Sequence, residues 1–450
     1  MAKVFLTWAC SLLLLVACGG GGGDSNVTTI SGPGLNASLG GAPVSIPFVQ
    51  RANNLSVSVE SGPTTGFSLA PSANILYATV KVCLPGETTQ CQTIDHVQVD
   101  TGSVGLRVLA SKVNQLHLPA VALTSGSAWE CYPFVIGGLW GSNAVADVWL
   151  GPQRASALPV QLIQDDPNAA LQAPLDCANA SNGQVLSSAS ALGSNGILGI
   201  GSVTLDCGLM CLQGNYAGSY VQYYSCPRDA TTAAACEPAA VPANLQVFNP
   251  VAALPADNNG VVLAMPAVSG LGATSASGEL IFGINTQANN QLSSSTSRIR
   301  LGVDWQANPD SYLNVTTTYK GQTIRNSYLD TGTNGLFFTD RSNTPITRCQ
   351  GSTWYCAVNL PIQTADISDG DSLLPGNVAN VQFRVGNADA LFLTTNAAFG
   401  DLAGAPPSST ITAKPSFSWG LPFFYGRRVY LSIWERAGAV NGPWYAWNSL

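Results

Sequence analysis

The sequence predicts an all-β protein composed of two similar halves, and three observations support this prediction. Residues 100–106 read Asp-Thr-Gly-Ser-Val-Gly-Leu and residues 330–336 read Asp-Thr-Gly-Thr-Asn-Gly-Leu, each after a run typical of a β-strand. A repeat of this kind indicates duplication. Helical periodicity is scarce along the 450 residues, whose apolar runs are short and bounded by Gly, Pro, Ser and Asn. The about 400 residues after position 45 also exceed what one hydrophobic core usually serves.

The N-terminal residues resemble a bacterial lipoprotein export signal. Residues 1–17 combine a basic start, an apolar run too short to span a bilayer, and Leu-Val-Ala directly before Cys18. The resemblance implies cleavage before Cys18 and its lipidation; ordinary cleavage nearby is the alternative. Residues 18–45 would then be the lipidated Cys and a flexible Gly-rich tether. Because Gly19 follows Cys18, we expect a cell-envelope protein at the outer rather than the inner membrane, periplasmic or surface-facing.

Composition argues against several functional classes. Charged residues make up 10% of the chain and the net charge is −7, with no basic run, which argues against a nucleic-acid partner. Only two histidines are present, His96 and His117, and the cysteines lack the repeated C-x-x-C spacing of zinc sites. The Gly-X-Ser-X-Gly elbow of serine hydrolases does not occur. We therefore expect no metal and no cofactor, and we expect a monomer.

Ten of the twelve cysteines remain once Cys10 and Cys18 are set aside. An even number in an exported protein predicts disulfides. Local spacing suggests four pairs and leaves two cysteines for each other, although other connectivities stay open; the suggested pairs are Cys83–Cys91, Cys207–Cys211, Cys226–Cys236, Cys349–Cys356 and, by remainder, Cys131–Cys177.

The first half predicts a series of short strands around Asp100. A hairpin through Cys91 leads into the strand that ends at Asp100. The segments expected around it are strands at 43–49, 55–59, 75–82 and 158–163, a hairpin over 131–151 turning around 137–141, a loop-rich stretch at 166–194, a compact apolar segment at 195–201 and a Cys-rich surface insertion at 205–242.

The second half follows the same order. Residues 312–319 and 323–329 predict a hairpin that ends at Asp330, and the apolar segment 419–424 corresponds to 195–201. With strands expected near the midpoint, we place an N-terminal lobe carrying Asp100 at residues 46–285 and a C-terminal lobe carrying Asp330 at residues 286–450.

Taken in order, these segments resemble a pepsin-like aspartic protease from about residue 75 to the C-terminal region. The resemblance rests on the two Asp-Thr-Gly segments, on Gly-Ile-Leu-Gly at 196–199, on Gly-Glu-Leu-Ile-Phe-Gly at 278–283 and on the residues after Gly420. It implies two pseudo-symmetric β-barrel lobes with a cleft between them, and a catalytic pair formed by Asp100 and Asp330. A bacterial lipoprotein with these motifs also resembles an uncharacterised family of bacterial exported lipoproteins.

The three residues after each aspartate would support the pair; they are Thr101, Gly102 and Ser103, and Thr331, Gly332 and Thr333. By the resemblance, each first threonine bonds across to the opposite loop, and the third residue bonds its own aspartate. Each glycine lets a backbone N–H approach the carboxylate.

The sequence also departs from this family. Arg107 lies where a Trp commonly steadies a flap Tyr, and Asn334 lies where Ser or Thr is usual. The flap hairpin lacks the Tyr-Gly pair of the family, so Tyr132 and Trp140 are the flap candidates, although both could equally be packing residues. These departures bear on flap closure and substrate positioning more than on the pair.

Two facing carboxylates cannot both ionise easily, so they share a proton; one can act as base toward a water and the other as acid toward a carbonyl. We therefore expect an aspartic endopeptidase that acts on a peptide or protein substrate in the cleft. The alternatives are a weak or inactive peptide-binding lipoprotein of the same fold, an all-β exported glycosidase, which also uses two carboxylates, and turn residues without chemistry. His96 is expected to be buried and hydrogen-bonded.

Overall fold

The computed structural model describes residues 40–62, 73–180, 184–212, 221–303, 312–370, 376–406, 415–434, 436 and 442–450. The predicted signal peptide, Cys18 and most of the tether therefore lie outside the described residues. Residues 39–450 form one compact unit, which is predominantly β and has two sheets, as the all-β prediction requires. Within the described ranges, no helix is long and apolar enough to cross a membrane.

The larger sheet takes its strands from the first half, from β15 at the start of the second half, and from the C-terminal end. They are β1 (Val44–Ser45), β2 (Asn54–Val59), β3 (Leu76–Cys83), β4 (Cys91–Asp100), β5 (Val104–Leu109), β6 (Ala122–Leu123), β7 (Gly126–Phe134), β8 (Gly137–Leu150), β9 (Gln153–Ile163), β10 (Gly196–Ile200), β11 (Tyr223–Cys226), β12 (Glu237–Pro238), β13 (Gly260–Met265), β14 (Ala276–Phe282), β15 (Ile299–Arg300), β23 (Arg427–Ser432) and β24 (Trp444–Ser449).

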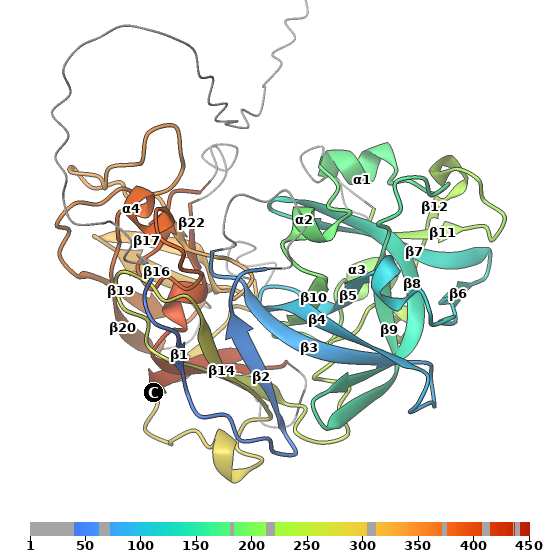
Figure 1. Cartoon of the computed structure of the whole chain (residues 1–450), viewed down its shortest axis with the longest axis horizontal. Coiled ribbons are helices and arrows are strands. Elements are labelled where there is room, and N and C mark those ends of the chain that lie inside the picture. The colour runs from blue at the N-terminus through green and yellow to red at the C-terminus, as the bar shows by residue number, and fades with distance from the viewer. Residues whose placement is uncertain are drawn as a thin grey trace, which may run out of the picture. The chain divides into compact units, whose positions relative to one another are not determined.

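The smaller sheet belongs entirely to the second half. Its strands are β16 (Val315–Tyr319), β17 (Gln322–Leu329), β18 (Leu336–Phe338), β19 (Gln363–Ser368), β20 (Val378–Phe383), β21 (Ala403–Gly404) and β22 (Ser416–Trp419). The α-helices of the described part are short: α1 (Leu175–Ala180), α2 (Ala189–Leu192), α3 (Leu209–Leu212) and α4 (Ala388–Phe392). Figure 1 shows β16, β17, β19, β20 and β22 gathered in one group and β3, β4, β5, β7, β8 and β9 in another.

Each aspartate loop is built by the same strand arrangement. In the first half, β10 pairs parallel to β4 and antiparallel to β5, so it fills the space between the strands on either side of the Asp100 loop. In the second half, β22 pairs parallel to β17 and antiparallel to β18, on either side of the Asp330 loop. The repeat seen in the sequence is therefore also a repeat of topology.

Strands from both ends of the chain meet at the middle of the larger sheet. β13 pairs with β14 and with β23, β14 pairs with β2, and β23 pairs with β24. β23 and β24 lie in the second half of the sequence, yet they belong to the sheet that is formed mainly by strands of the first half. The predicted boundary at residue 285 is therefore crossed by one continuous sheet.

Five disulfides join the cysteines that the spacing paired: Cys83–Cys91, Cys131–Cys177, Cys207–Cys211, Cys226–Cys236 and Cys349–Cys356. The first of these closes the β3–β4 hairpin that leads to Asp100, since Cys83 and Cys91 are direct cross-strand partners. A bridge of this kind restricts the unfolded chain and typically contributes about 2–4 kcal/mol.

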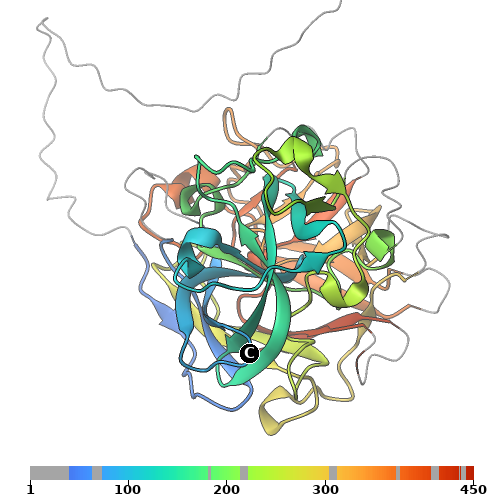
Figure 2. The same cartoon turned by 90° about the vertical axis from the view of Figure 1, so that its right-hand side faces the viewer.

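Three details differ from the expected strands. The strand expected over 43–49 is only two residues long, at Val44–Ser45. The hairpin expected to turn around 137–141 turns earlier, between Phe134 and Gly137, and becomes the long strands β7 and β8, which with β9 face the viewer in Figure 2. A Cβ at Gly141 would collide with the backbone of Leu162 on β9, so this glycine permits close strand pairing instead of a turn.

The third difference concerns residues 205–242, which were expected to be a surface insertion. β11 in this stretch pairs with β7, and its residues are buried. Asp206 also binds Arg107 inside the protein, at 2.9 Å. Part of the segment is therefore integrated into the larger sheet, beside β7.

Candidate active site

The two aspartate loops lie against each other. A Cβ built on Gly102 would lie 2.7 Å from Asp330 Cγ, and one built on Gly332 would lie 2.7 Å from Asp100 Cγ. Any larger residue at either position would displace the opposite carboxyl group, so these two positions need glycine for close approach. The carboxyl groups of Asp100 and Asp330 are therefore close neighbours, and Asp100 raises the pKa of Asp330. The structure therefore brings together the two residues predicted as a pair.

Threonine side chains lock the loops to each other. Thr331 Oγ1 donates to the carbonyl oxygen of Val99 at 2.7 Å and accepts from the Thr101 N–H at 3.1 Å. In the mirrored arrangement, Thr101 Oγ1 donates to the carbonyl oxygen of Leu329 at 3.1 Å and accepts from the Thr331 N–H at 3.0 Å. Both threonines are buried. Because each of these bonds joins one loop to the other, the separation of the aspartates is fixed.

Each carboxyl group also receives the same two donors from its own loop. The N–H of the glycine two residues later donates at 2.8 Å to Oδ1 of Asp100 or Asp330. The hydroxyls of Ser103 and Thr333 donate at 2.5 Å to Oδ2 of their aspartates. The carboxyl groups of Asp100 and Asp330 are therefore held by equivalent hydrogen bonds, each from its own loop.

The electrostatics of the pair favour one shared proton. Burial, the charge of Asp100 and the hydrogen bond to it raise the pKa of Asp330 well above its usual range, against the opposing bonds from Thr333 and Gly332. Asp100 is 5% exposed, so water screens the pair poorly. The pair can therefore hold one carboxylic acid beside one carboxylate, which is the state needed for acid and base chemistry at one position.

The flap candidates have different environments. Trp140 on β8 is buried, donates through Nε1 to the carbonyl oxygen of Leu171 at 3.0 Å and packs edge-on to Tyr224. It is a packing residue beside the Cys131–Cys177 disulfide. Tyr132 on β7 is half-buried, and the guanidinium of Arg107 lies over its ring at 3.8 Å. Of the two candidates, only Tyr132 is linked to the strand that follows Asp100.

Arg107 belongs to a buried ionic cluster that sequence reasoning did not find. Its Nη2 lies 2.7 Å from Glu130 Oε1 and 2.9 Å from Asp206 Oδ2. Burial would lower the pKa of Arg107, but Glu130 and Asp206 raise it above its ordinary value. Burial and Glu130 raise the pKa of Asp206, which hydrogen-bonds Glu130. The signal available in the sequence was Arg107 itself, the one charge in an otherwise apolar strand that is buried throughout.

Two residues that the sequence singled out, and one cluster of potential metal ligands, lie outside the aspartate pair. His96 is half-buried and lies edge-on to the Tyr77 ring at 5.0 Å. Its Nδ1 lies 3.2 Å from Asp95 Oδ2 but makes no hydrogen bond within the described part of the chain, so the expectation of a buried, hydrogen-bonded side chain is wrong. The carbonyl oxygen of Asn334 accepts from the buried Asn74 side chain at 2.9 Å. Cys349, Cys356 and Asp389 bring potential metal ligands together, but the two cysteines form a disulfide and offer no thiolate.

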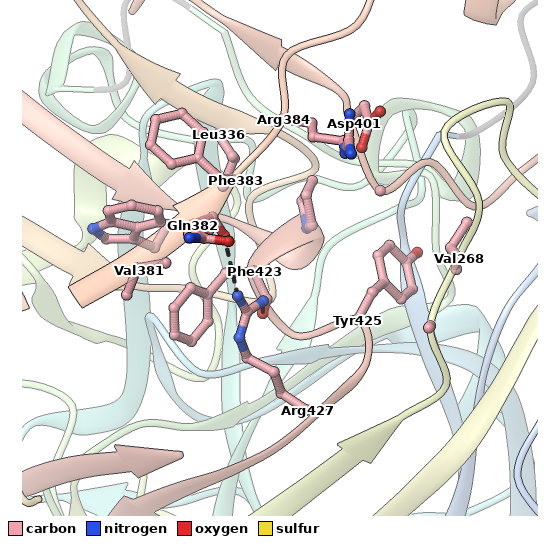
Figure 3. A pocket seen from close by; sticks show the side chains of 14 residues that line it. Val268, Leu336, Val381, Gln382, Phe383, Arg384, Asp401, Phe423, Tyr425 and Arg427 are labelled. Carbon is pink, nitrogen blue, oxygen red and sulfur yellow. Dashed lines mark hydrogen bonds between the residues drawn. The ribbon is translucent and has the colours of Figure 1, made fainter. Parts of the chain in front are cut away.

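A pocket of about 180 Å³ is lined mostly by second-half residues, together with Ala267 and Val268 of the first half, and its lining includes neither Asp100 nor Asp330. Figure 3 shows Arg427 reaching toward Gln382 beside the Phe423 ring. The guanidinium donates to the carbonyl oxygens of Phe423 at 2.5 Å and Gln382 at 3.4 Å, and it lies 4.7 Å from the Phe423 ring centroid. These bonds tie the short helix at Leu421–Phe423 to β20, which accounts for this arginine structurally.

A comparison with curated proteins finds no match for the chain. One family model matches residues 49–447, which is nearly all of the described part and includes both aspartate loops. The chain therefore belongs to the family described as "Protein of unknown function (DUF3443)".

Proposed function

We propose that this protein is an aspartic endopeptidase with a pepsin-like, bilobal fold, whose lobes at 46–285 and 286–450 carry one catalytic aspartate each beside a substrate cleft. The observation that carries the proposal is the Asp100–Asp330 pair. The two aspartate loops lie in contact, with each glycine against the opposite carboxyl group, and four cross-loop bonds of Thr101 and Thr331 fix the separation of the loops.

The chemistry follows from the single shared proton. With Asp330 protonated, the Asp100 carboxylate accepts a proton from a water bound between the two, and the water oxygen bonds to the carbonyl carbon of the peptide. Asp330 donates its proton to the carbonyl oxygen, which gives a neutral gem-diol. When the C–N bond breaks, the leaving nitrogen takes the proton from Asp100 and a diol hydroxyl returns a proton to Asp330, so the pair regains its initial state.

The alternatives from other classes fit the geometry less well. Retaining glycosidases keep their two carboxyl groups about 5–5.5 Å apart and inverting ones keep them farther apart, to leave room for the sugar or a water. The close contact of the two aspartate loops, each glycine lying against the opposite carboxyl group, disfavours both. If Asp100 and Asp330 were turn residues without chemistry, buried threonines that hydrogen-bond to the opposite loop would not be needed.

A peptide-binding protein of the same fold is the second candidate. It is favoured by Arg107, which replaces the Trp that steadies the flap in the resembling family, because altered flap support could leave binding intact while slowing cleavage. The two candidates share the site and differ in turnover, so a cleavage assay decides between them.

We also propose that the protein works in the cell envelope, with Cys18 as a lipid anchor at the outer membrane and a periplasmic or surface-facing catalytic unit. Support comes from the lipobox-like Leu-Val-Ala-Cys sequence and from five disulfides, which persist in oxidising compartments. Replacing Cys18 by Ser should release the protein from the membrane fraction. Retention of the Cys18→Ser variant there would place the anchor elsewhere.

The enzyme proposal is tested by measuring cleavage of a denatured protein from acid to neutral pH. Asp100→Asn and Asp330→Asn should each lower kcat on the order of 10³-fold, and the double variant should be hardly worse, because the residues act as one unit. Asp229→Asn, at an exposed aspartate, is the matched control and should keep full activity. A folded wild type that neither cleaves nor binds a hydroxyl-bearing transition-state mimic would refute catalysis. Binding of unreactive peptides with no cleavage would favour the second candidate.

A further inference from the structure

One of the positions at which the two halves differ lies just after the repeated motif. Arg107 lies seven residues after Asp100, and Phe337 lies seven residues after Asp330. Phe337 packs on Trp354 with ring centroids 5.0 Å apart, whereas Arg107 lies over the Tyr132 ring at 3.8 Å. Both halves therefore place a planar side chain against an aromatic ring, but only the first half uses a charged one.

The charged version is costly for stability. Arg107 is 1% exposed, and its side chain needs the buried carboxylates of Glu130 and Asp206 to compensate its charge. Desolvating such a cluster is expensive, and well-packed apolar replacements for buried ion pairs are often neutral or stabilising. The Phe337–Trp354 pair of the second half shows that an uncharged side chain can fill the equivalent position. The Arg107 cluster therefore points to a role other than stability.

Arg107 joins the Asp100 loop to the β7–β8 hairpin. On one side, Nη1 donates to the carbonyl oxygen of Val104 at 3.0 Å, and Val104 directly follows Ser103, which binds Asp100. On the other side, the guanidinium holds two residues of β7, through the ion pair with Glu130 and the contact with the Tyr132 ring. Arg107 therefore connects Tyr132 to the loop that carries Asp100.

The hairpin ends in an apolar surface. Val135 and Ile136 at its turn are 63% and 64% exposed, and Phe134 beside them packs against Tyr132 at 5.0 Å. Arg107 ties the stem of this hairpin to the loop that carries Asp100, so exposed apolar side chains at the hairpin's end offer contact area to a bound chain.

We propose that Arg107 is a positioning residue: it fixes the Tyr132 ring and the hairpin over the Asp100 side of the pair, where they hold an extended peptide for cleavage. This inference rests on the proposed function. Arg107 itself touches no reacting atom in this scheme. Its effect passes through Tyr132, whose ring packs on the bound peptide and so acts mainly on substrate binding.

The first test compares Tyr132→Leu with the control Asp229→Asn, at an exposed aspartate outside the cluster. The control variant should stay within about twofold of wild type in kcat/KM. The Leu variant loses the cation–π contact, worth roughly a factor of ten, and should show that loss as a raised KM with a smaller change in kcat. Equal kinetics for the Leu variant and wild type would overturn the inference.

The second test removes the charge without leaving unpaired carboxylates. A triple variant, Arg107→Met with Glu130→Gln and Asp206→Asn, should fold and unfold with a midpoint near that of wild type. The triple variant should nevertheless have a KM about tenfold higher than wild type, and it should bind the transition-state mimic about tenfold more weakly. A stable triple variant with wild-type KM would show that the cluster is only structural.

A readout independent of activity separates this inference from the proposed function. Hydrogen exchange of the amides at the hairpin turn should become about tenfold faster in the triple variant and in Tyr132→Leu, but not in Asp229→Asn. Faster exchange in a protein whose wild type neither cleaves nor binds the mimic would support the positioning role and refute the peptidase. Unchanged exchange would overturn the positioning role whatever the activity.

Discussion

Replacing Thr331 by Val removes one of the two hydroxyls that lock the aspartate loops together, with almost no change in side-chain volume. The Val99 carbonyl and the Thr101 N–H each lose a bond, of 2.7 and 3.1 Å respectively, at a site where Thr331 is fully buried. A buried polar group that loses its partner costs about 1–3 kcal/mol. The free energy of unfolding should therefore fall by roughly 2–4 kcal/mol, a large part of the about 5–15 kcal/mol that stabilises a typical domain.

Activity should fall further than stability suggests. With the lock released, the loops can separate, and a displacement of about 1 Å of a reacting group can cost about 100-fold in rate. Thr331→Ser is the matched control because it keeps the hydroxyl and loses one methyl group, at a cost of about 1 kcal/mol. Urea unfolding and peptide cleavage would be measured for both variants. If Thr331→Val and Thr331→Ser unfold with the same free energy, the cross-loop bonds do not stabilise the protein and the reasoning fails.

Three shorter predictions concern the same site and its support. The pKa of Asp330 is raised in the folded protein above the unfolded value of about 3.9, so its contribution to stability is complete below about pH 4 and is lost as pH rises through the folded pKa. The unfolding free energy of wild type, measured in urea, minus that of Asp330→Asn should therefore shrink with rising pH. A constant or growing difference would contradict this prediction. Gly102→Ala should push the Asp330 carboxyl aside and lower kcat about 100-fold or more, since the new Cβ would lie 2.7 Å from Asp330 Cγ; full activity of this variant would mean that the loops lie farther apart. Replacing Cys131 and Cys177 by Ala should lower the unfolding free energy by about 2–4 kcal/mol in denaturant melts, because this disulfide closes a loop of 46 residues beside Trp140; an unchanged midpoint would show that packing alone holds the stem of the hairpin.

The parts predicted well from sequence are those with local causes. The aspartate loops were visible because each motif places a strand end, a glycine and a hydroxyl within four residues, and because the motif occurs twice. Four of the five disulfides join cysteines that are four to ten residues apart, so proximity along the chain was enough to pair them. The pairing of Cys131 with Cys177 was predicted only because these two cysteines were left over after the other four pairs.

The parts that were missed depend on contacts between distant segments. Glu130 and Asp206 are 23 and 99 residues from Arg107, and nothing in their own neighbourhoods distinguishes them from surface carboxylates. The stretch 205–242 was expected at the surface because its cysteines and polar residues resemble a loop, but pairing of β11 with β7 buries part of it. Gly141 was read as part of a turn, although its missing side chain serves the close pairing of β8 with β9.

The second glycine of each repeated motif helps to explain why the halves could diverge at Arg107 and Phe337. A Cβ on Gly105 would collide with Val247 Cγ1 and lie 2.9 Å from Arg107 Nη1, and a Cβ on Gly335 would lie 2.8 Å from Trp354 Cζ3 and 3.3 Å from Phe337 Cε2. In both halves, therefore, the glycine leaves room for the planar side chain two residues later to fold back over the aspartate loop. A site of this shape accepts an aromatic ring or a guanidinium, because both are flat, but only the guanidinium can bind the Val104 carbonyl and a carboxylate at once. The duplicated loops thus supply two equivalent aspartates, and the difference at this single position gives only the first one a charged link to the β7–β8 hairpin.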